Sequence, residues 1–267
     1  MSITDRLPSL RSNSLYHPIR NAYLCLFKHE FWKSTIRDVR RFYSGFVGPG
    51  DLVFDVGANI GTYSKMFLSL GATVVAVEPT PSLIKDLQRI PRLKVEGCAL
   101  GDADGVLPLS VSNLNLLNSL VPGWEKQIAG THDGQVVNVP VTTLDALIAK
   151  YGVPDFIKID VEGYESKVLS GLSKLPKYLS FEFHAAEIEA AIACVKRLQG
   201  CQFNYCFGEP GQLALREWVT EKEICDLLRS LPRDWQQFGD IFAARNGTSG
   251  GRRSSVAEPS TPPVPSG

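Results

Sequence analysis

Short apolar runs alternate with stretches of helical periodicity from Asp51 onward, and this alternation constrains the fold more than any other feature of the sequence. Repeated strand–helix units are typical of a parallel sheet with helices on both faces. The sequence therefore predicts an α/β, doubly wound fold that binds ligands beyond the carboxyl ends of its strands. The predicted strands occupy 52–56, 73–77, 93–100, 106–111, 156–161, 179–184, 202–207, 213–219 and 238–243, and the predicted helices 60–70, 81–89, 165–172 and 186–198.

Capping residues predict two further helices. Thr142 is followed three residues later by Asp145, and Thr220 is followed three residues later by Glu223. A hydroxyl and a carboxylate at this spacing can each accept a hydrogen bond from a backbone N–H in the first helical turn. We therefore expect one helix to begin near Thr142 and another to begin at Thr220.

Composition divides the 267 residues into three predicted segments. Residues 1–48 form a helical extension, because large apolar residues recur at helical steps over 19–46, and we interpret it as a helix packed at the domain edge. Residues 49–246 carry the strand–helix units and form the main domain. Residues 247–267 are rich in Ser, Gly and Pro, and they predict a disordered tail because they bury too little surface to offset the ordering entropy.

Charge and cysteine content exclude several classes of protein. Lys plus Arg and Asp plus Glu both number 28, and no sustained basic patch occurs, so no nucleic-acid partner is predicted. The six cysteines lack CxxC spacing, which argues against a zinc site. No apolar run reaches about 18 residues, and the first residues lack the core of a signal peptide. We therefore expect no membrane span and a cytoplasmic, reducing location.

The first strong motif joins a predicted strand to a predicted helix over residues 55–61, whose sequence is Asp-Val-Gly-Ala-Asn-Ile-Gly. Its glycines, Gly57 and Gly61, allow a tight turn and a close approach of a ligand to the backbone. The next predicted strand ends at Glu78, where a carboxylate can accept both hydroxyls of a ribose. The two features together predict a nucleoside-binding unit.

The spacing within this motif distinguishes between two nucleoside cofactors. A dinucleotide fingerprint requires G-x-G-x-x-G, so that a helix N-terminus can hold a pyrophosphate. Here Asn59 takes the place of the second glycine. Asp55 lies beside the turn, where a carboxylate suits the sulfonium and ammonium of S-adenosylmethionine (SAM) and repels a pyrophosphate. The motif therefore favours SAM over NAD.

The second strong motif is a set of polar, mostly ionisable residues on the predicted strands 156–161 and 179–184 and directly after the first of them. Alternate side chains of a strand share one face, and a central parallel strand is normally apolar on both faces. The exceptions are tolerable where they cluster over the binding crevice at the carboxyl ends. If the two strands are neighbours, their polar residues lie close together. These residues are Lys158, Asp160 and Glu162 on the first strand, and Ser180, Glu182 and His184 on the second.

Five of these six residues have a candidate chemical role. His184 ends a strand at the expected ligand edge, and it is our first candidate for a general base. Asp160 and Glu162 are candidates for a base or for orienting an acceptor, and Lys158 can pair with either acid. Mixed nitrogen and oxygen ligands allow a divalent metal to bridge Asp160, Glu182 and His184. A hydrogen-bonded set explains the same residues, and we therefore predict no metal.

The two motifs, taken together and in order, resemble the FkbM family of SAM-dependent methyltransferases over about half of the chain. The resemblance implies a class I methyltransferase fold, a mostly parallel seven-stranded sheet whose last strand, at 238–243, is antiparallel. Residues 49–246 are then the methyltransferase domain, and SAM is the cofactor. The strings that carry the resemblance are 55–61, 77–79, 99–102, 143–145, 158–163 and 182–184.

The resemblance also implies roles for individual residues. The turn with Gly57, Asn59 and Gly61 would cradle the methionine and ribose parts of SAM. Glu78 would hold the ribose diol, and Asp102 would flank the adenine. The remaining cofactor candidates are Asp55, beside the turn, and Asp160, which would face the methionine end or the acceptor.

The resemblance further implies methylation of a hydroxyl oxygen on a small molecule or sugar. Fold does not fix the acceptor, and the stretch 114–135, expected to bind it, reads as a loop without a specific signal. Two alternatives remain open. One is a non-catalytic SAM-binding interaction protein, and the other, disfavoured by the missing G-x-G-x-x-G, is an NAD-linked oxidoreductase.

Overall fold

The computed structural model describes residues 37–112, 132–208, 210–233 and 237–248. Most of the predicted helical extension and of the predicted tail therefore lies outside the described residues, as does the predicted acceptor loop up to residue 131. None of the helices in the described part has the length and apolar character that crossing a bilayer requires.

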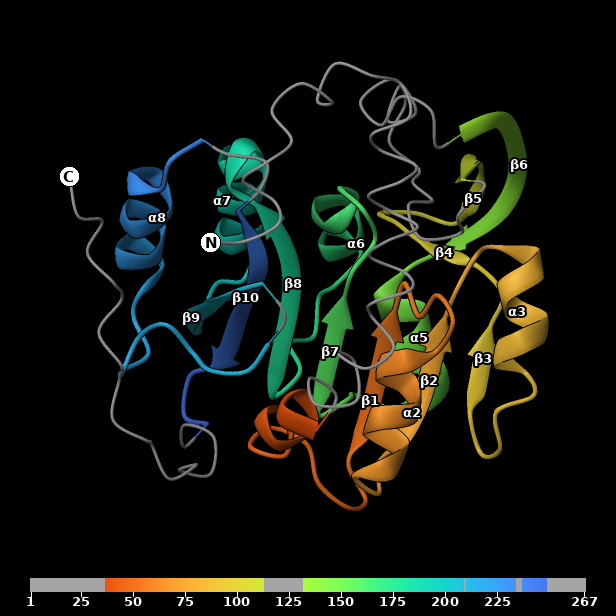
Figure 1. The fold of residues 1–267 in the computed structure, drawn as a ribbon, viewed down its shortest axis with the longest axis horizontal. Coiled ribbons are helices and arrows are strands. Elements are labelled where there is room, and N and C mark those ends of the chain that lie inside the picture. Colours follow the sequence, from red (N-terminus) through yellow and green to blue (C-terminus); the bar gives the residue numbers. More distant parts are fainter. Residues whose placement is uncertain (1–36, 113–131, 209, 234–236, 249–267) are drawn as a thin grey trace, which may run out of the picture.

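The main sheet has seven strands in the order β3-β2-β1-β7-β8-β10-β9 (Figure 1). All run parallel except β10, which is antiparallel to both of its neighbours. The predicted α/β sheet with a reversed last strand is confirmed. Its strands are β1 (Leu52–Val56), β2 (Thr73–Val77), β3 (Lys94–Glu96), β7 (Phe156–Ile159), β8 (Tyr178–His184), β9 (Cys201–Phe207) and β10 (Phe238–Arg245).

Helices cover both faces of this sheet, as the sequence predicts. One face packs apolar side chains of β1, β7 and β8 against α5, α6, α7 and α8. The other face packs against α2 and a helix over 37–43, and in Figure 1 α2 lies in front of the sheet. The helices are α2 (Thr62–Ser69), α3 (Pro81–Leu87), α5 (Leu144–Tyr151), α6 (Glu165–Ser170), a 3₁₀ turn η3 (Ala185–Glu187), α7 (Ile188–Arg197) and α8 (Glu221–Ser230).

The helix over 37–43 contributes to the core rather than only covering its edge. Tyr43 is fully buried, and its ring centroid lies 5.2 Å from that of Phe67 and 5.6 Å from that of Phe156. Edge-to-face aromatic pairs at such distances stabilise a core beyond their buried area. The described end of the predicted extension is thus packed into the domain, and the domain boundaries stay a prediction.

Two of the predicted strands differ from what the structure shows. The run 93–100 divides into β3 and β4 (Ala99–Leu100), and β4 joins a separate three-stranded sheet with β5 (Gly105–Ser112) and β6 (His132–Thr142). The strand predicted over 213–219 is wrong, because only a single bridge from Val219 to Phe203 forms there. The Asn204 side-chain amide instead bonds the backbone N–H and C=O of Leu215, at 3.1 and 2.9 Å, and occupies groups that a strand would use.

The two predicted helix starts have different outcomes. Thr220 and Glu223 form the reciprocal capping box at the start of α8. At α5 the N-cap is Thr143, whose hydroxyl accepts from Ala146 N at 3.1 Å. The Asp145 carboxylate instead accepts from Ser173 N, which is a tertiary contact. Asp145 therefore does not form the reciprocal cap that its spacing from Thr142 predicts.

Candidate active site

The two sequence motifs meet at the carboxyl edge of the sheet because β1 lies between β2 and β7. Gly57 follows β1 with a φ of 82°, and a Cβ at this position would lie 1.8 Å from the carbonyl oxygen of Asp160. A side chain at residue 57 would therefore separate the turn from the end of β7. The second glycine, Gly61, has a φ of 78° and packs against the side chains of Leu87 and Ile90.

Glu78 lies at the end of β2 and fixes the turn after β1. Its Oε2 accepts from Asn59 N at 2.9 Å, and its Oε1 accepts from Thr80 N at 2.9 Å. Burial raises the pKa of this carboxyl, and the hydrogen bonds from Thr80 and Asn59 act in the opposite direction. Each carboxylate oxygen has a further lone pair, which can accept from a hydroxyl. These lone pairs suit the predicted role toward a ribose, which stays a prediction.

Asp55 lies within β1, below the turn. Its Oδ2 accepts from the Ser64 hydroxyl of α2 at 2.5 Å, and the side chain is almost fully buried. Burial raises the pKa of Asp55 to about 6, although the Ser64 bond and the charge of Lys158 oppose this effect. The carboxylate thus joins β1 to the helix that follows the turn.

Asp102 is hydrogen-bonded to a helix rather than to the turn after β1. It follows β4, and its Oδ2 is 2.8 Å from Nζ of Lys167 on α6. The hydrogen bond from Lys167 lowers the pKa of the Asp102 carboxyl. Both side chains are about half exposed, so the pair contributes little to stability.

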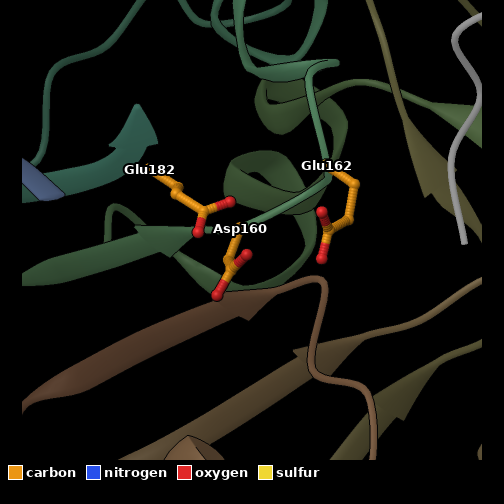
Figure 2. A group of neighbouring side chains, drawn as sticks. All are labelled: Asp160, Glu162 and Glu182. Atoms are coloured by element: carbon orange, nitrogen blue, oxygen red, sulfur yellow. The ribbon is translucent and has the colours of Figure 1, made fainter. Parts of the chain in front are cut away.

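Three carboxylates, those of Asp160, Glu162 and Glu182, converge at the ends of β7 and β8, as Figure 2 shows. One oxygen from each lies within 4.8 Å of the others. The register of β7 and β8 pairs Lys158 with Ser180, so that Asp160 and Glu182 follow on the same face. Burial, and then the charge of Asp160, raises the pKa values of Glu162 and Glu182 well above their usual range. We call these three residues the carboxylate cluster.

Lys158 lies beneath the carboxylate cluster rather than in it. Its side chain is only 2% exposed, and Nζ is 2.7 Å from Oδ2 of Asp160. Nζ also lies 4.3 Å from the ring centroid of Tyr63. Burial alone lowers the pKa of this ammonium, but the charges of Asp160 and Asp240 outweigh burial and hold it well above its usual range. The charged Lys158 therefore fixes Asp160 from below and has no surface for direct contact with an acceptor.

His184 is the last residue of β8 and lies beside the cluster. Its Nε2 is 3.9 Å from Oε2 of Glu182, and its ring centroid is 6.0 Å from that of Phe238. Burial lowers the pKa of His184, and the charges of Glu187 and Asp160 act in the opposite direction. The imidazole is therefore neutral near pH 7, which is the state that a general base requires.

Three residues that our sequence reasoning missed complete the site. Glu165 Oε1 accepts from Val161 N and Gly163 N, both at 3.2 Å, and thereby closes the turn that directs Glu162. Burial raises the pKa of Glu165 to about 7. Asp240 is paired with Glu182 across β10 and β8, and Tyr43 lies on the same face of the sheet. The sequence feature that could have identified Asp240 as a site residue is its position as an acidic residue within the otherwise apolar run 238–243.

The site offers ligands for cations. Carboxylate oxygens suit hard divalent ions, and the carboxylate cluster could hold one. The metal site considered in the sequence analysis used a different set of ligands, namely Asp160, Glu182 and His184. The same negative charge suits a sulfonium or an ammonium. The absence of a metal stays a prediction.

Glu162 has a φ of 53°, a left-handed backbone that is unfavourable for residues other than glycine. We expect Glu162→Gln to raise the free energy of unfolding near pH 8, because it removes a partly buried charge beside the other carboxylates of the cluster. Glu162→Gly removes the strain as well and should add about 1 kcal/mol. A carboxyl whose pKa is raised by folding loses stability as pH rises through the folded value, so both gains should shrink toward about pH 5. Urea unfolding measures them, and two variants less stable than the native chain would contradict the prediction.

The sheet order, its reversed strand and a nucleoside-type turn beside an acidic edge define the class I methyltransferase fold. The sequence model of the "Methyltransferase FkbM domain" matches residues 55–232. The chain therefore belongs to the FkbM family of SAM-dependent methyltransferases. The family resemblance read from the two motifs is confirmed.

Individual proteins are also similar to this chain. The 31-O-demethyl-FK506 methyltransferase FkbM of Streptomyces tacrolimicus is 32% identical over 157 residues, which cover 46% of this chain and 60% of that protein. A TehB-like SAM-dependent methyltransferase structure from Corynebacterium glutamicum is 12% identical, with a TM-score of 0.43, 87% of this chain covered and 98% of that chain. A precorrin-6y C5,15-methyltransferase structure from Geobacter metallireducens is 9% identical, with a TM-score of 0.40 and coverages of 77% and 86%.

Proposed function

We propose that this chain transfers the methyl group of SAM to a hydroxyl oxygen of a small molecule or sugar. One observation carries the proposal: the turn anchored by Glu78 and the cluster beside His184 adjoin where Gly57 lies against the Asp160 carbonyl. Residues suited to a nucleoside and residues suited to proton transfer are thereby neighbours. The Streptomyces relative is named for a 31-O-demethyl acceptor, which supports oxygen as the methylated atom.

The residues present fit SAM in their chemistry. Glu78 has lone pairs for the ribose hydroxyls, and the carboxylate cluster offers negative charge to a sulfonium and an ammonium. The turn with Gly57, Asn59 and Gly61 would hold the remainder of the cofactor. Asp55 would act through the turn that it anchors, and Asp102 would flank the adenine. When bound, SAM supplies an electrophilic methyl group.

Proton transfer falls to His184 in this proposal. A hydroxyl must lose its proton as its oxygen is methylated, and a neutral imidazole at the edge of the site can take it. Asp160 and Glu162 orient the acceptor, and Glu182 lies beside His184. Lys158 is a positioning residue that acts through Asp160, because it is buried and hydrogen-bonded to that carboxylate.

Calorimetric titration with SAM, and separately with NAD, tests the cofactor assignment. We expect the native chain to bind SAM with a dissociation constant of about 1 μM and to bind NAD weakly or not at all. Glu78→Ala should weaken SAM binding by at least about tenfold, because the ribose loses its acceptor and the Asn59 turn loses its anchor. Glu217→Ala is the control, since Glu217 is exposed in the segment before α8.

Several outcomes separate the proposal from its alternatives. Binding of NAD in place of SAM would favour the oxidoreductase. SAM binding that is indifferent to Glu78 would contradict the assigned ribose site. SAM binding without formation of S-adenosylhomocysteine, across hydroxyl compounds that include glucose and 31-O-demethyl-FK506, would favour a non-catalytic binding protein. A cytoplasmic location and the lack of a nucleic-acid partner stay predictions.

A further inference from the structure

A hollow opens beside the carboxylate cluster, between the turn after β7 and the turn after β8. Its volume is about 600 Å³, within the range of small-molecule sites, and its lining includes Gly163, Ala186, Glu187, Ala190 and Arg233. A smaller recess of about 30 Å³ is lined by Glu182 and His184 and shares Gly163, Glu187 and Ala190 with the hollow. The shared residues place the two spaces next to each other, so the hollow adjoins the recess that His184 lines.

Carboxylates outnumber basic groups in the described lining of the two spaces. Glu187 and Glu189 line the hollow, and Glu182 lines the recess. The one arginine among the described lining residues, Arg233, has its Nη2 3.4 Å from Oε1 of Glu189, so its charge is largely offset by that carboxylate. An anionic ligand would meet net negative charge, whereas hydroxyl groups would meet hydrogen-bond acceptors.

The small lining residues leave room for a ring. Gly163, Ala186 and Ala190 carry no side chain beyond Cβ, while Glu187 reaches both the hollow and the recess. Glu187 belongs to η3, directly after the strand that ends in His184. The candidate base and Glu187 are therefore three residues apart in the chain, and both line the recess.

We propose that this hollow binds the methyl acceptor as a polyhydroxylated ring without an anionic group, and that Glu187 excludes anionic analogues. The inference rests on the proposed methyl transfer and names the acceptor class for it. Glu187 is a specificity-determining residue here and takes no part in proton transfer. Carboxylates that accept from ring hydroxyls also reject a carboxylate or phosphate on the same ring.

Three matched monosaccharides test the proposal: glucose, glucosamine and glucuronate, which differ in charge on one ring. Their binding is measured by saturation-transfer NMR on the full chain loaded with S-adenosylhomocysteine. We expect glucose and glucosamine to bind and glucuronate to bind at least about tenfold more weakly. Glu187→Gln should strengthen glucuronate binding severalfold and leave glucose within about twofold, and added salt should reduce the discrimination. Glu217→Gln, the same change at an exposed site, should leave all three unchanged.

The outcomes separate this inference from the proposed function. Glucuronate binding as tight as glucose binding, a pattern unchanged by Glu187→Gln, or no binding of any of the three sugars would overturn it. SAM calorimetry on the same samples reports on the cofactor independently. SAM binding without sugar binding would overturn the acceptor class alone, and loss of SAM binding in the native chain would overturn the methyl transfer on which it rests.

Discussion

His184→Ala is expected to lower methyl transfer by about 10²–10⁴-fold, the contribution typical of a general base. The imidazole lies at the end of β8, beside Glu182, and lines the recess next to the hollow. SAM affinity should change by less than about twofold, because no cofactor contact is assigned to this residue. The assay follows S-adenosylhomocysteine formation with an acceptor that the native chain methylates. Calorimetry with SAM runs alongside it.

The pH dependence supplies an independent measurement of the same role. A base must be unprotonated, so the rate falls as pH drops through its pKa. Burial lowers the pKa of His184, and the acid limb of kcat/KM should therefore lie below the ordinary histidine value of about 6.5. His184→Ala should lose this limb, and Glu217→Gln should keep it. Turnover within about fivefold of the native rate, or an acid limb that survives the substitution, would assign the proton transfer to another group.

Lys158→Met is expected to lower the free energy of unfolding by about 3–5 kcal/mol, the cost of removing one partner of a buried ion pair. The ammonium is the positive charge between Asp55, opposite it in the sheet, and Asp160, which it contacts at 2.7 Å. Methionine fills a similar volume, so the loss reports charge rather than packing. Urea unfolding near pH 8 measures it.

The loss should depend on pH in a definite direction. Lys158 lowers the pKa of Asp55, so its removal raises that pKa further above the unfolded value. A carboxyl with a raised folded pKa costs stability as pH rises through that value, and the deficit should therefore shrink toward about pH 5. Lys222→Met is the matched control: Lys222 and Asp226 also lie 2.7 Å apart, but both side chains are exposed. Its effect should stay below about 0.5 kcal/mol. Equal losses from the two substitutions would contradict the buried-pair interpretation.

Local chemistry determined much of this fold. The bounds of β1 and β2 agree with the sequence prediction, because apolar runs between glycines and acids specify short buried strands. The Thr220–Glu223 capping box depends only on residues three apart, and it forms as predicted. The position of Glu78 at the end of β2, one strand away from the turn, also follows from order along the chain.

Other features were decided by contacts between distant segments. The run 93–100 has one apolar pattern but divides between two sheets, because strand partners are chosen in three dimensions. The strand predicted over 156–161 ends at Ile159, and the turn held by Glu165 places Glu162 in a left-handed conformation. Periodicity does not predict such a turn, since it depends on one carboxylate accepting from two backbone amides.

The sequence by itself determined the family, the fold and the two groups of residues that meet at the carboxyl edge. Side-chain alternation and the order of the elements along the chain are read directly from the sequence, and they placed Asp160 and His184 correctly at that edge. Only the tertiary structure decided that Lys158 is buried beneath Asp160, that Asp240 pairs with Glu182 across two strands, and that His184 lines a recess next to a larger hollow. Burial depends on which helix covers which face of the sheet. The sequence alone therefore does not reveal how deeply a charged residue is buried or which residue pairs with it.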